Sequence, residues 1–334
     1  QDLVQGTTTV QSTLDLAYYP SEIGPYNNVT EEEFIGDTSE NWAGIMRPIN
    51  ATNFEQSNVE FIEFWLLDTF SEIISEDDDL GELYFHLGNI SEDILKDGRK
   101  QFENGLPALN GQNLVHETPW GKVPSTQSLL YAFNTVAEDR DLQDVGFDGL
   151  DDNQERLIYT NGPPEDPARD NYQFFVAATG GVLDRYKNYN GTQGNSPVAF
   201  SDTDRGNTTE PDSEDINRDQ SMNTIDSYFE YRIPISKSMG VGNHPFITDV
   251  RENVKVSVPN GDEITTRWIQ FKIPVQKGYY EDTQFDAYFE AINNIEDLRS
   301  IRFMRMVLKG FEQPTVLRFG TLDLVRGDWR RYNQ

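Results

Sequence analysis

Two stretches of the chain alternate regularly between apolar and polar positions. In Trp268–Val275 the apolar phase begins with Ile269 and Phe271 and continues at every second residue. Successive side chains of a β-strand point to opposite faces, so this pattern predicts a strand with one buried face. Phe229–Ile235 repeats the pattern, including an outward-phase proline near the strand end, where a missing backbone N–H is tolerated. We expect both strands in one β-sandwich.

The same reasoning predicts further strands on both sides of a long central region. In Val59–Leu67 both phases are apolar or aromatic, which indicates a central strand that is covered on two faces. A short helix is expected at residues 286–292. The other strands are expected at residues 42–49, 83–87, 228–235, 265–275, 301–308 and 315–325. Seven or eight antiparallel strands without long helices between them favour a mainly β fold, an antiparallel β-sandwich of the jelly-roll type.

The sequence divides into an arm, two groups of strands and a large insertion. Residues 1–40 are polar, and we expect an extended N-terminal arm with little structure of its own. Residues 41–334 are expected to be a single β-sandwich domain, formed by segments 41–95 and 226–330. The insertion subdomain, residues 96–225, is rich in Gly, Asn, Asp and Pro, which predicts loops and short helices.

One helix is predicted where the chain passes from the first group of strands into the insertion. Ser91 is a suitable N-cap, and acids follow it in the first turn, so we expect a short helix that ends near Gly105. The rest of the insertion is irregular. A compact domain seldom holds so much irregular chain unless some interaction ties it down.

Charge and cysteine content exclude several classes of protein. The 334 residues carry a formal net charge of −30, which repels nucleic acid phosphates and anionic membranes. No run approaches the roughly 18 apolar residues of a membrane helix, so we expect no membrane span in this chain and no nucleic acid partner. The absence of cysteine excludes disulfides, thiolate metal sites and a cysteine nucleophile. A surface this acidic also repels itself, and bound cations would relieve that repulsion.

Two acidic segments match the spacing of a twelve-residue calcium loop, in which oxygens at positions 1, 3, 5, 7, 9 and 12 surround one ion. The first spans residues 144–155 and has its turn glycine, Gly149, at position 6. Gly146 at position 3 offers no side chain, so a water would have to replace that ligand. The expected metal ligands in this loop are Asp144, Asp148, Leu150, Asp152 and Glu155.

The second calcium-like loop spans residues 215–226. Gln220 stands where the turn glycine belongs, which strains the match. The opposing interpretation is that 57 acids produce such spacings by chance, and that Asp, Asn and Gly are favoured in turns anyway. Both interpretations stay open, with Ca²⁺ as the one cofactor suggested and no organic cofactor expected. The expected ligands here are Asp215, Asn217, Asp219, Ser221, Asn223 and Asp226.

The remaining candidate chemistry favours a non-catalytic protein. His86, His116 and His244 are far apart in sequence and form no metal-binding pattern. Carboxylate pairs suited to glycoside hydrolysis are always available among so many acids, so they carry little weight for a glycan-cleaving enzyme. The five tryptophans could stack on sugars, although buried or rim tryptophans are more common. A calcium-stabilised carbohydrate-binding module of a secreted protein is therefore the alternative function.

Segments along nearly the whole chain resemble one protein family. They include LYFHLGNISEDILKDGRKQFENGLP and FGTLDLVRGDWRRY. In chain order they are Glu40–Ile49, Ile62–Phe70, Leu83–Pro107, Glu117–Pro124, Asp184–Pro197, Glu214–Asn223 and Phe319–Tyr332. These segments are similar to the SprA/Sov family, whose members form the outer-membrane translocon barrel of the type IX secretion system of Bacteroidetes. That system exports folded proteins, gliding adhesins among them.

The resemblance implies a non-enzymatic role in protein export and gliding motility. The chain begins with Gln1 and is far shorter than such a barrel protein, so we expect one soluble domain inserted in, or attached to, the remainder of the barrel. It would cap or gate the pore and contact secreted cargo or accessory subunits. We expect it on the cell exterior, because hydrated acidic loops suit a cap, with the periplasm as the alternative. The resemblance supplies no catalytic residues and no metal ligands.

Overall fold

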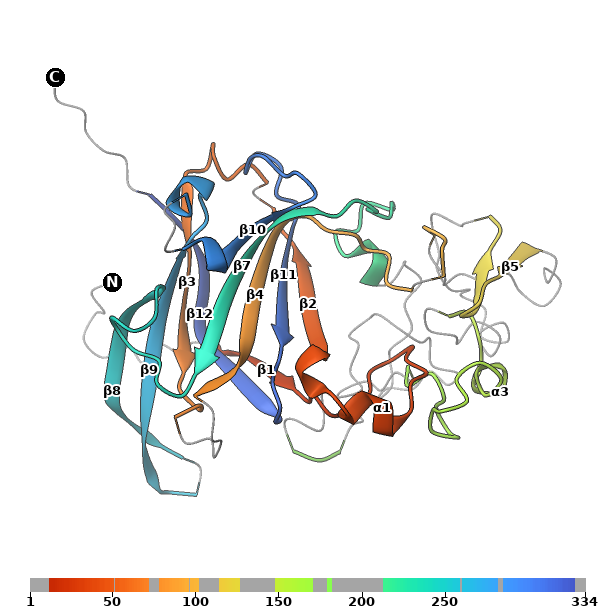
Figure 1. The fold of residues 1–334 in the computed structure, drawn as a ribbon, viewed down its shortest axis with the longest axis horizontal. Helices are drawn as coiled ribbons and strands as arrows, with labels where there is room; N and C mark the ends of the chain where they lie inside the picture. Colours follow the sequence, from red (N-terminus) through yellow and green to blue (C-terminus); the bar gives the residue numbers. More distant parts are fainter. Residues whose placement is uncertain are drawn as a thin grey trace.

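The computed structural model describes residues 12–50, 52–71, 78–95, 97–101, 114–126, 148–170, 179–181, 213–258, 260–281 and 285–327. Ten strands build the body of the molecule (Figure 1). In chain order they are β1 (Leu14–Tyr18), β2 (Trp42–Pro48), β3 (Val59–Leu67), β4 (Asp79–Asn89), β7 (Ser227–Ser236), β8 (Ile247–Ser257), β9 (Glu263–Pro274), β10 (Phe289–Ile292), β11 (Phe303–Lys309) and β12 (Thr315–Arg326).

The smaller elements lie at the edges of this body and in the central region. In Figure 1, α3 and β5 lie to one side of the ten strands. Short 3-10 turns occur at Thr38–Glu40, Ser213–Asp215, Lys277–Tyr279 and Asp286–Tyr288. The other elements are α1 (Glu31–Ile35), β5 (Val115–Glu117), β6 (Lys122–Pro124) and α3 (Asp152–Glu155).

The ten strands form two five-stranded sheets that pack face to face. The first has the order β1-β12-β3-β9-β8 and the second the order β10-β7-β4-β11-β2, and every pair of neighbouring strands is antiparallel. The predicted antiparallel β-sandwich is therefore confirmed. The chain crosses between the sheets at most of its connections, as is typical of jelly rolls.

The core lies between the two sheets and is rich in aromatic rings. Phe271 in β9 is fully buried, and so is Phe64 beside it in β3. The Phe64 ring lies 5.6 Å from the ring of Phe85, which belongs to β4 in the opposite sheet. Both stretches with regular alternation, in β7 and β9, turn their apolar phase into this core, one from each sheet.

The N-terminal arm contributes more than predicted. Residues 14–18 form β1, which pairs with β12, and the Asp15 carboxylate accepts hydrogen bonds from Arg318 at 2.9 and 2.7 Å. Leu16 packs against the core and Tyr18 is buried. The expectation of an arm with little structure was wrong for this segment, because its apolar phase completes one edge of the core.

Two helix predictions were also wrong. Residues 90–95 and 97–101 contain no helix, while the remainder of the predicted helix lies outside the described residues. Glu92 is drawn into the interior instead, where it accepts backbone N–H groups of another loop. At residues 286–292 a 3-10 turn is followed by β10, which pairs with β7.

The strands of the sandwich come from residues 14–89 and 227–326. The stretch between them carries β5, β6 and α3 in its described parts. Most of the predicted insertion, residues 96–225, lies outside the described residues, so its status as a subdomain stays a prediction.

Candidate metal centre

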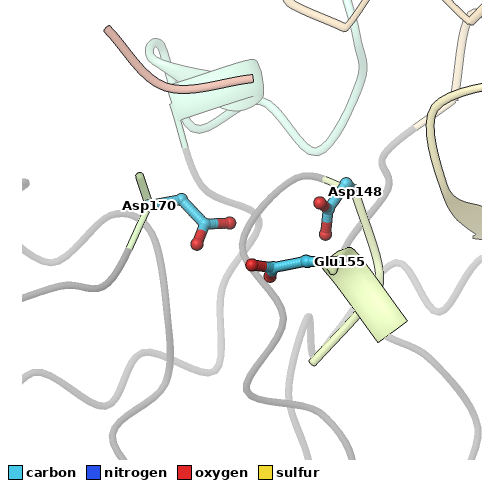
Figure 2. A group of neighbouring side chains, drawn as sticks. All are labelled: Asp148, Glu155 and Asp170. Carbon is cyan, nitrogen blue, oxygen red and sulfur yellow. The ribbon is translucent and has the colours of Figure 1, made fainter. Parts of the chain in front are cut away.

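Residues 148–170 bring together acids from a turn, a short helix and a following loop. The side chain of Asp151 caps α3 by accepting the backbone N–H groups of Asn153 and Gln154. The last residue of α3, Glu155, faces Asp148 from the preceding turn, and Asp170 approaches from the loop beyond (Figure 2). The three carboxylates present oxygens that all lie within 4.8 Å of one another.

Two glycines fix the position of Asp148. Gly149 has φ +68°, the left-handed conformation expected of the turn glycine, and a Cβ there would collide with the carbonyl of Lys122. At Gly121 a Cβ would overlap the backbone of Asp148, and Lys122 N donates to the Asp148 carbonyl at 2.6 Å. The β5–β6 hairpin therefore packs closely against the backbone of Asp148 and holds its carboxylate in position.

The loop that carries Asp170 is held against α3 by a hydrogen bond from its backbone to the Glu155 side chain. Glu155 Oε2 accepts the N–H of Ala168 at 3.1 Å, and the Ala168 carbonyl accepts the N–H of Tyr26 at 2.9 Å. Asp166 Oδ1 accepts the N–H of Asp170 at 3.0 Å. The Glu155 carboxylate therefore also positions the loop that supplies Asp170.

Burial and mutual repulsion perturb these acids strongly. Asp148 is fully buried, and burial, followed by the charges of Asp170 and Glu155, raises its pKa to about 10. Burial and the charge of Asp170 raise the pKa of Glu155 to about 8. Asp148 Oδ1 accepts the N–H of Leu150 at 2.9 Å, but its Oδ2 accepts no hydrogen bond from a described residue. Carboxylates placed this close must hold protons or share a cation.

The predicted ligands of the first loop are only partly brought together. Asp148 and Glu155 belong to the cluster, whereas Asp144 lies outside the described residues. Asp152 joins a second group of acids around Glu155, together with Asp166. The structure shows the Leu150 N–H donating to Asp148, and its carbonyl stays a predicted ligand.

Asp170 was missed by the sequence reasoning. It lies well beyond the twelve-residue window that begins at Asp144, so loop spacing could not find it. The available signal was the dense run of acids that ends at Asp170. That signal alone is weak in a chain with 57 acids.

The second loop directs its oxygens onto its own backbone. The two carboxylate oxygens of Asp215 accept the N–H groups of Asp219 and Gln220, each at 3.0 Å. Asp219 in turn accepts the N–H and hydroxyl of Ser221 at 2.9 and 2.6 Å, and Asn217 donates to it. Gln220 has φ +64°, so it adopts the turn conformation that a glycine was expected to supply. Calcium binding by this loop stays a prediction.

A carboxylate from the first half of the chain holds the second loop in place. Glu92 is buried, and it accepts the N–H of Ile216 at 2.8 Å and both the N–H and the side-chain amide of Asn223 at 2.9 and 2.7 Å. Burial raises its pKa in spite of these hydrogen bonds. Nearby, Asp226 accepts the N–H of Ser91 at 3.0 Å. Glu92 was not predicted as a site residue, and its role here is structural.

Two of the histidines are built into the sandwich. His86 Nε2 lies 2.9 Å from a carboxylate oxygen of Glu230, and its Nδ1 accepts Arg305 Nε–H at 2.9 Å. Burial lowers the pKa of His86. His244 Nδ1 accepts the N–H of Phe246 at 3.2 Å, and burial lowers its pKa to about 4. Neither belongs to a metal-binding group among the described residues.

Trp65 and Trp268, both described, do not offer open ring faces for a sugar, and Trp329 lies outside the described residues. A Cβ at Gly320 would lie 2.9 Å from the ring of Trp268, so that ring covers the Gly320 backbone. The guanidinium of Arg251 lies 5.9 Å from the ring centroid of Trp65. Trp42 differs, because 63% of it is exposed.

Comparison with known proteins identifies a family. Residues 145–334 match the SprA_N family model, described as a motility related/secretion protein. No curated protein matches the chain. The matched segment covers more than half of the sequence and contains α3 and every strand from β7 to β12. In the part of the chain that the structure describes, none of the helices has the length and apolar character needed to span a bilayer. The chain belongs to the SprA_N family of motility-related secretion proteins.

Proposed function

We propose that this chain is a non-catalytic domain of the outer-membrane translocon of the Bacteroidetes type IX secretion system. It helps to cap or gate the export pore and contacts cargo or accessory subunits. Family membership supports the motility and secretion role. The finer proposal, contact with other polypeptides, is supported by the surface of the sandwich.

The exposed edge strand β2 carries the proposal. It closes one end of its sheet and, among the described strands, pairs only with β11, in continuous register over seven residues. Trp42 is 63% exposed and Ile45 is 45% exposed. A regular, largely apolar edge strand offers unpaired backbone groups and side-chain anchors to an extended segment of another chain, here along residues 42–46, before the charge of Arg47 and the proline at 48.

The other sheet edges carry the usual protection against such pairing. β8 has register shifts between Ile247 and Asp249 and between Arg251 and Val254, and it carries several charges. β10 has only four residues. β1 has five, with its Asp15 in an ion pair with Arg318. Because bulges, charge and short length discourage pairing, β2 is the edge best suited to hold a partner strand.

A non-catalytic role agrees with the positions of the described ionisable groups. The buried His86 and the half-buried His244 hold hydrogen bonds within the sandwich, and Asp148 and Glu155 are closed off from solvent. The carbohydrate-binding alternative needs open aromatic rings, whereas Trp65 and Trp268 have protein groups against them. The positions of these groups therefore favour neither a glycan-cleaving enzyme nor a carbohydrate-binding module over the export role.

The test is made in the full-length protein that contains this chain. The double variant Trp42→Ser, Ile45→Thr removes the apolar anchors of β2 and leaves its backbone intact. We expect export of cargo and gliding to fall by tenfold or more, with an unchanged amount of translocon in the outer membrane. The matched control is Val256→Thr, Ile264→Thr, two exposed apolar residues on the β8–β9 hairpin, for which we expect normal export. Normal export by the β2 variant would contradict the proposal.

A further inference from the structure

Asp148 presents a buried oxygen that no described residue satisfies. The residue is 0% exposed, and its Oδ2 makes no hydrogen bond of regular geometry with a described residue. The Tyr159 hydroxyl lies close enough to interact with this carboxylate, but it donates to the Trp120 carbonyl at 3.3 Å. Figure 2 shows its carboxylate directed toward that of Glu155. A buried charged oxygen without a partner is costly, and cations commonly resolve such sites.

The described basic side chains nearest the cluster in sequence hydrogen-bond elsewhere. Arg169 Nη1 donates to the carbonyl of Asn27 at 3.4 Å. Lys122 Nζ donates to the amide oxygen of Gln154 at 3.2 Å. Arg156 donates to Asn153 and to a backbone carbonyl, at 2.7 and 2.8 Å. Among the described residues, no Lys or Arg forms an ion pair with Asp148 or Glu155. Without such a partner, the two acids can ionise together only when a cation from solution binds between them.

The ligand set selects the kind of cation. It consists only of carboxylate oxygens, which suit hard cations, whereas zinc prefers sites with histidine or cysteine. Calcium binds oxygen at about 2.3–2.6 Å, so two of its ligands can lie up to about 5 Å apart. Magnesium, at about 2.0–2.1 Å, allows only about 4 Å. The three oxygens all lie within 4.8 Å of one another, so one calcium ion can contact them all, whereas magnesium keeps several of its waters and is seldom held by protein carboxylates alone.

We propose that Asp148, Glu155 and Asp170 bind one calcium ion that joins the Asp148 turn, α3 and the loop at residues 166–170. This site differs from the loop expected from sequence spacing, because Asp170 supplies a ligand from outside the twelve-residue window. Asp152 and Asp166 form the neighbouring acid group that shares Glu155, and they strengthen the local attraction for a divalent ion.

The ion would fix a region whose contacts are largely backbone hydrogen bonds. The β5–β6 hairpin is attached through Lys122 N and the Asp148 carbonyl, and the N-terminal segment through Tyr26 N and the Ala168 carbonyl. Loss of the ion would loosen both attachments, since the carboxylates of Asp148 and Glu155 would then repel each other. The site is independent of the proposed contact through β2.

The first experiment is calorimetric titration of the full chain after treatment with a chelator and dialysis. We expect CaCl2 to bind, to raise the melting temperature and to protect residues 148–170 from protease, and MgCl2 to bind at least tenfold more weakly. Asp148→Asn and Glu155→Gln should each weaken calcium binding at least tenfold. The matched control Asp262→Asn removes an exposed acid in the β8–β9 hairpin and should bind calcium normally. Calcium binding that survives both site variants, or no binding by the parent chain, would overturn the proposal.

A second measurement does not depend on the folding of the site variants. Tyr159 N donates to the Glu155 carbonyl at 2.7 Å, and its ring lies 6.2 Å from that of Trp120. Terbium that replaces calcium should therefore luminesce on excitation of these rings, and calcium should displace it. Trp120→Phe should reduce the signal without changing calcium affinity. An unchanged signal, or a signal lost in Asp215→Asn instead, would place the ion elsewhere and overturn the assignment.

Discussion

Phe64 of β3 stacks on Phe271 of β9, with ring centroids 4.8 Å apart and ring planes 14° from parallel. The two residues come from opposite ends of the chain, separated by the whole central region. Phe64 also meets Phe319 of β12 at 5.3 Å and Phe85 across the core. One ring thus joins the early strands to the late strands and one sheet to the other.

Removal of this ring should destabilise the whole sandwich. We expect Phe64→Ala to lower the free energy of unfolding by about 3–5 kcal/mol, because a large buried ring is replaced by a cavity. The matched control is Phe61→Ala on the same strand, where the partly exposed ring contacts Lys272 at 4.3 Å and the expected loss is about 1 kcal/mol. Urea unfolding of the two variants measures both values. Equal losses would contradict a core centred on Phe64.

Glu92 should control the order of the second acidic loop. Glu92→Ala leaves three N–H donors of Ile216 and Asn223 without an acceptor, so we expect stability to fall by about 3 kcal/mol and trypsin to cut faster after Arg218. Glu290→Ala removes an exposed acid from β10 and is the control. Limited proteolysis with mass detection gives the cleavage rates. The loop is held by other contacts if cleavage after Arg218 is as slow in Glu92→Ala as in the parent chain.

His244 should make the fold sensitive to mild acid. Burial lowers its pKa from 6.5 to about 4, and the neutral ring accepts from Phe246 N and lies with Nε2 3.1 Å from the Pro234 carbonyl. A lowered pKa means that this contribution to stability is complete above pH 6.5 and is lost as the pH falls toward 4. The upper limit of the loss is about 3 kcal/mol, from about 1.4 kcal/mol per pKa unit.

The comparison of His244→Gln with the parent chain isolates this contribution. Urea midpoints between pH 7 and pH 4.5 should fall less steeply in the variant, because it lacks the His244 imidazole. They should still fall somewhat, since His86, whose pKa burial also lowers, titrates in both proteins. Parallel pH profiles would show that His244 is not the group responsible.

Gly121 should be intolerant of even one added carbon. A Cβ there would overlap the backbone of Asp148, so Gly121→Ala has to displace the β5–β6 turn. We expect the melting temperature of the full chain to fall by several degrees. At Gly278 a Cβ would meet no atom within 4 Å, so Gly278→Ala should have little effect. If both variants melt alike, the hairpin is not anchored on Asp148.

The sequence was most informative where one face of a strand is buried. Alternation located β3, β7 and β9, because the same core selects the apolar phase in all three strands. β8 was missed because most of its residues are exposed, and Ile247 is its one fully buried apolar residue. β1 was missed for another reason. It has five residues, and its partner β12 lies at the other end of the chain.

The acidic groups show the same division between local and distant information. Loop spacing found Asp148 and Glu155, which share a turn and a helix. It could not find Asp170, which is brought close to them because the backbone N–H of Ala168 donates to Glu155. Glu92 was interpreted as part of a helix start, since nothing nearby in sequence reveals that its partners are residues 216 and 223.

The most direct test of the domain's role in secretion is site-specific photo-crosslinking in cells that are actively exporting protein. A crosslinker at Ile45 in the full-length protein should capture a secreted cargo protein or an accessory subunit of the secretion system, and the Trp42→Ser change should abolish that product. The same crosslinker at Val256, on the protected β8 edge, should give no such product. Capture from both positions alike, or from neither, would contradict the assignment of β2 as the contact edge.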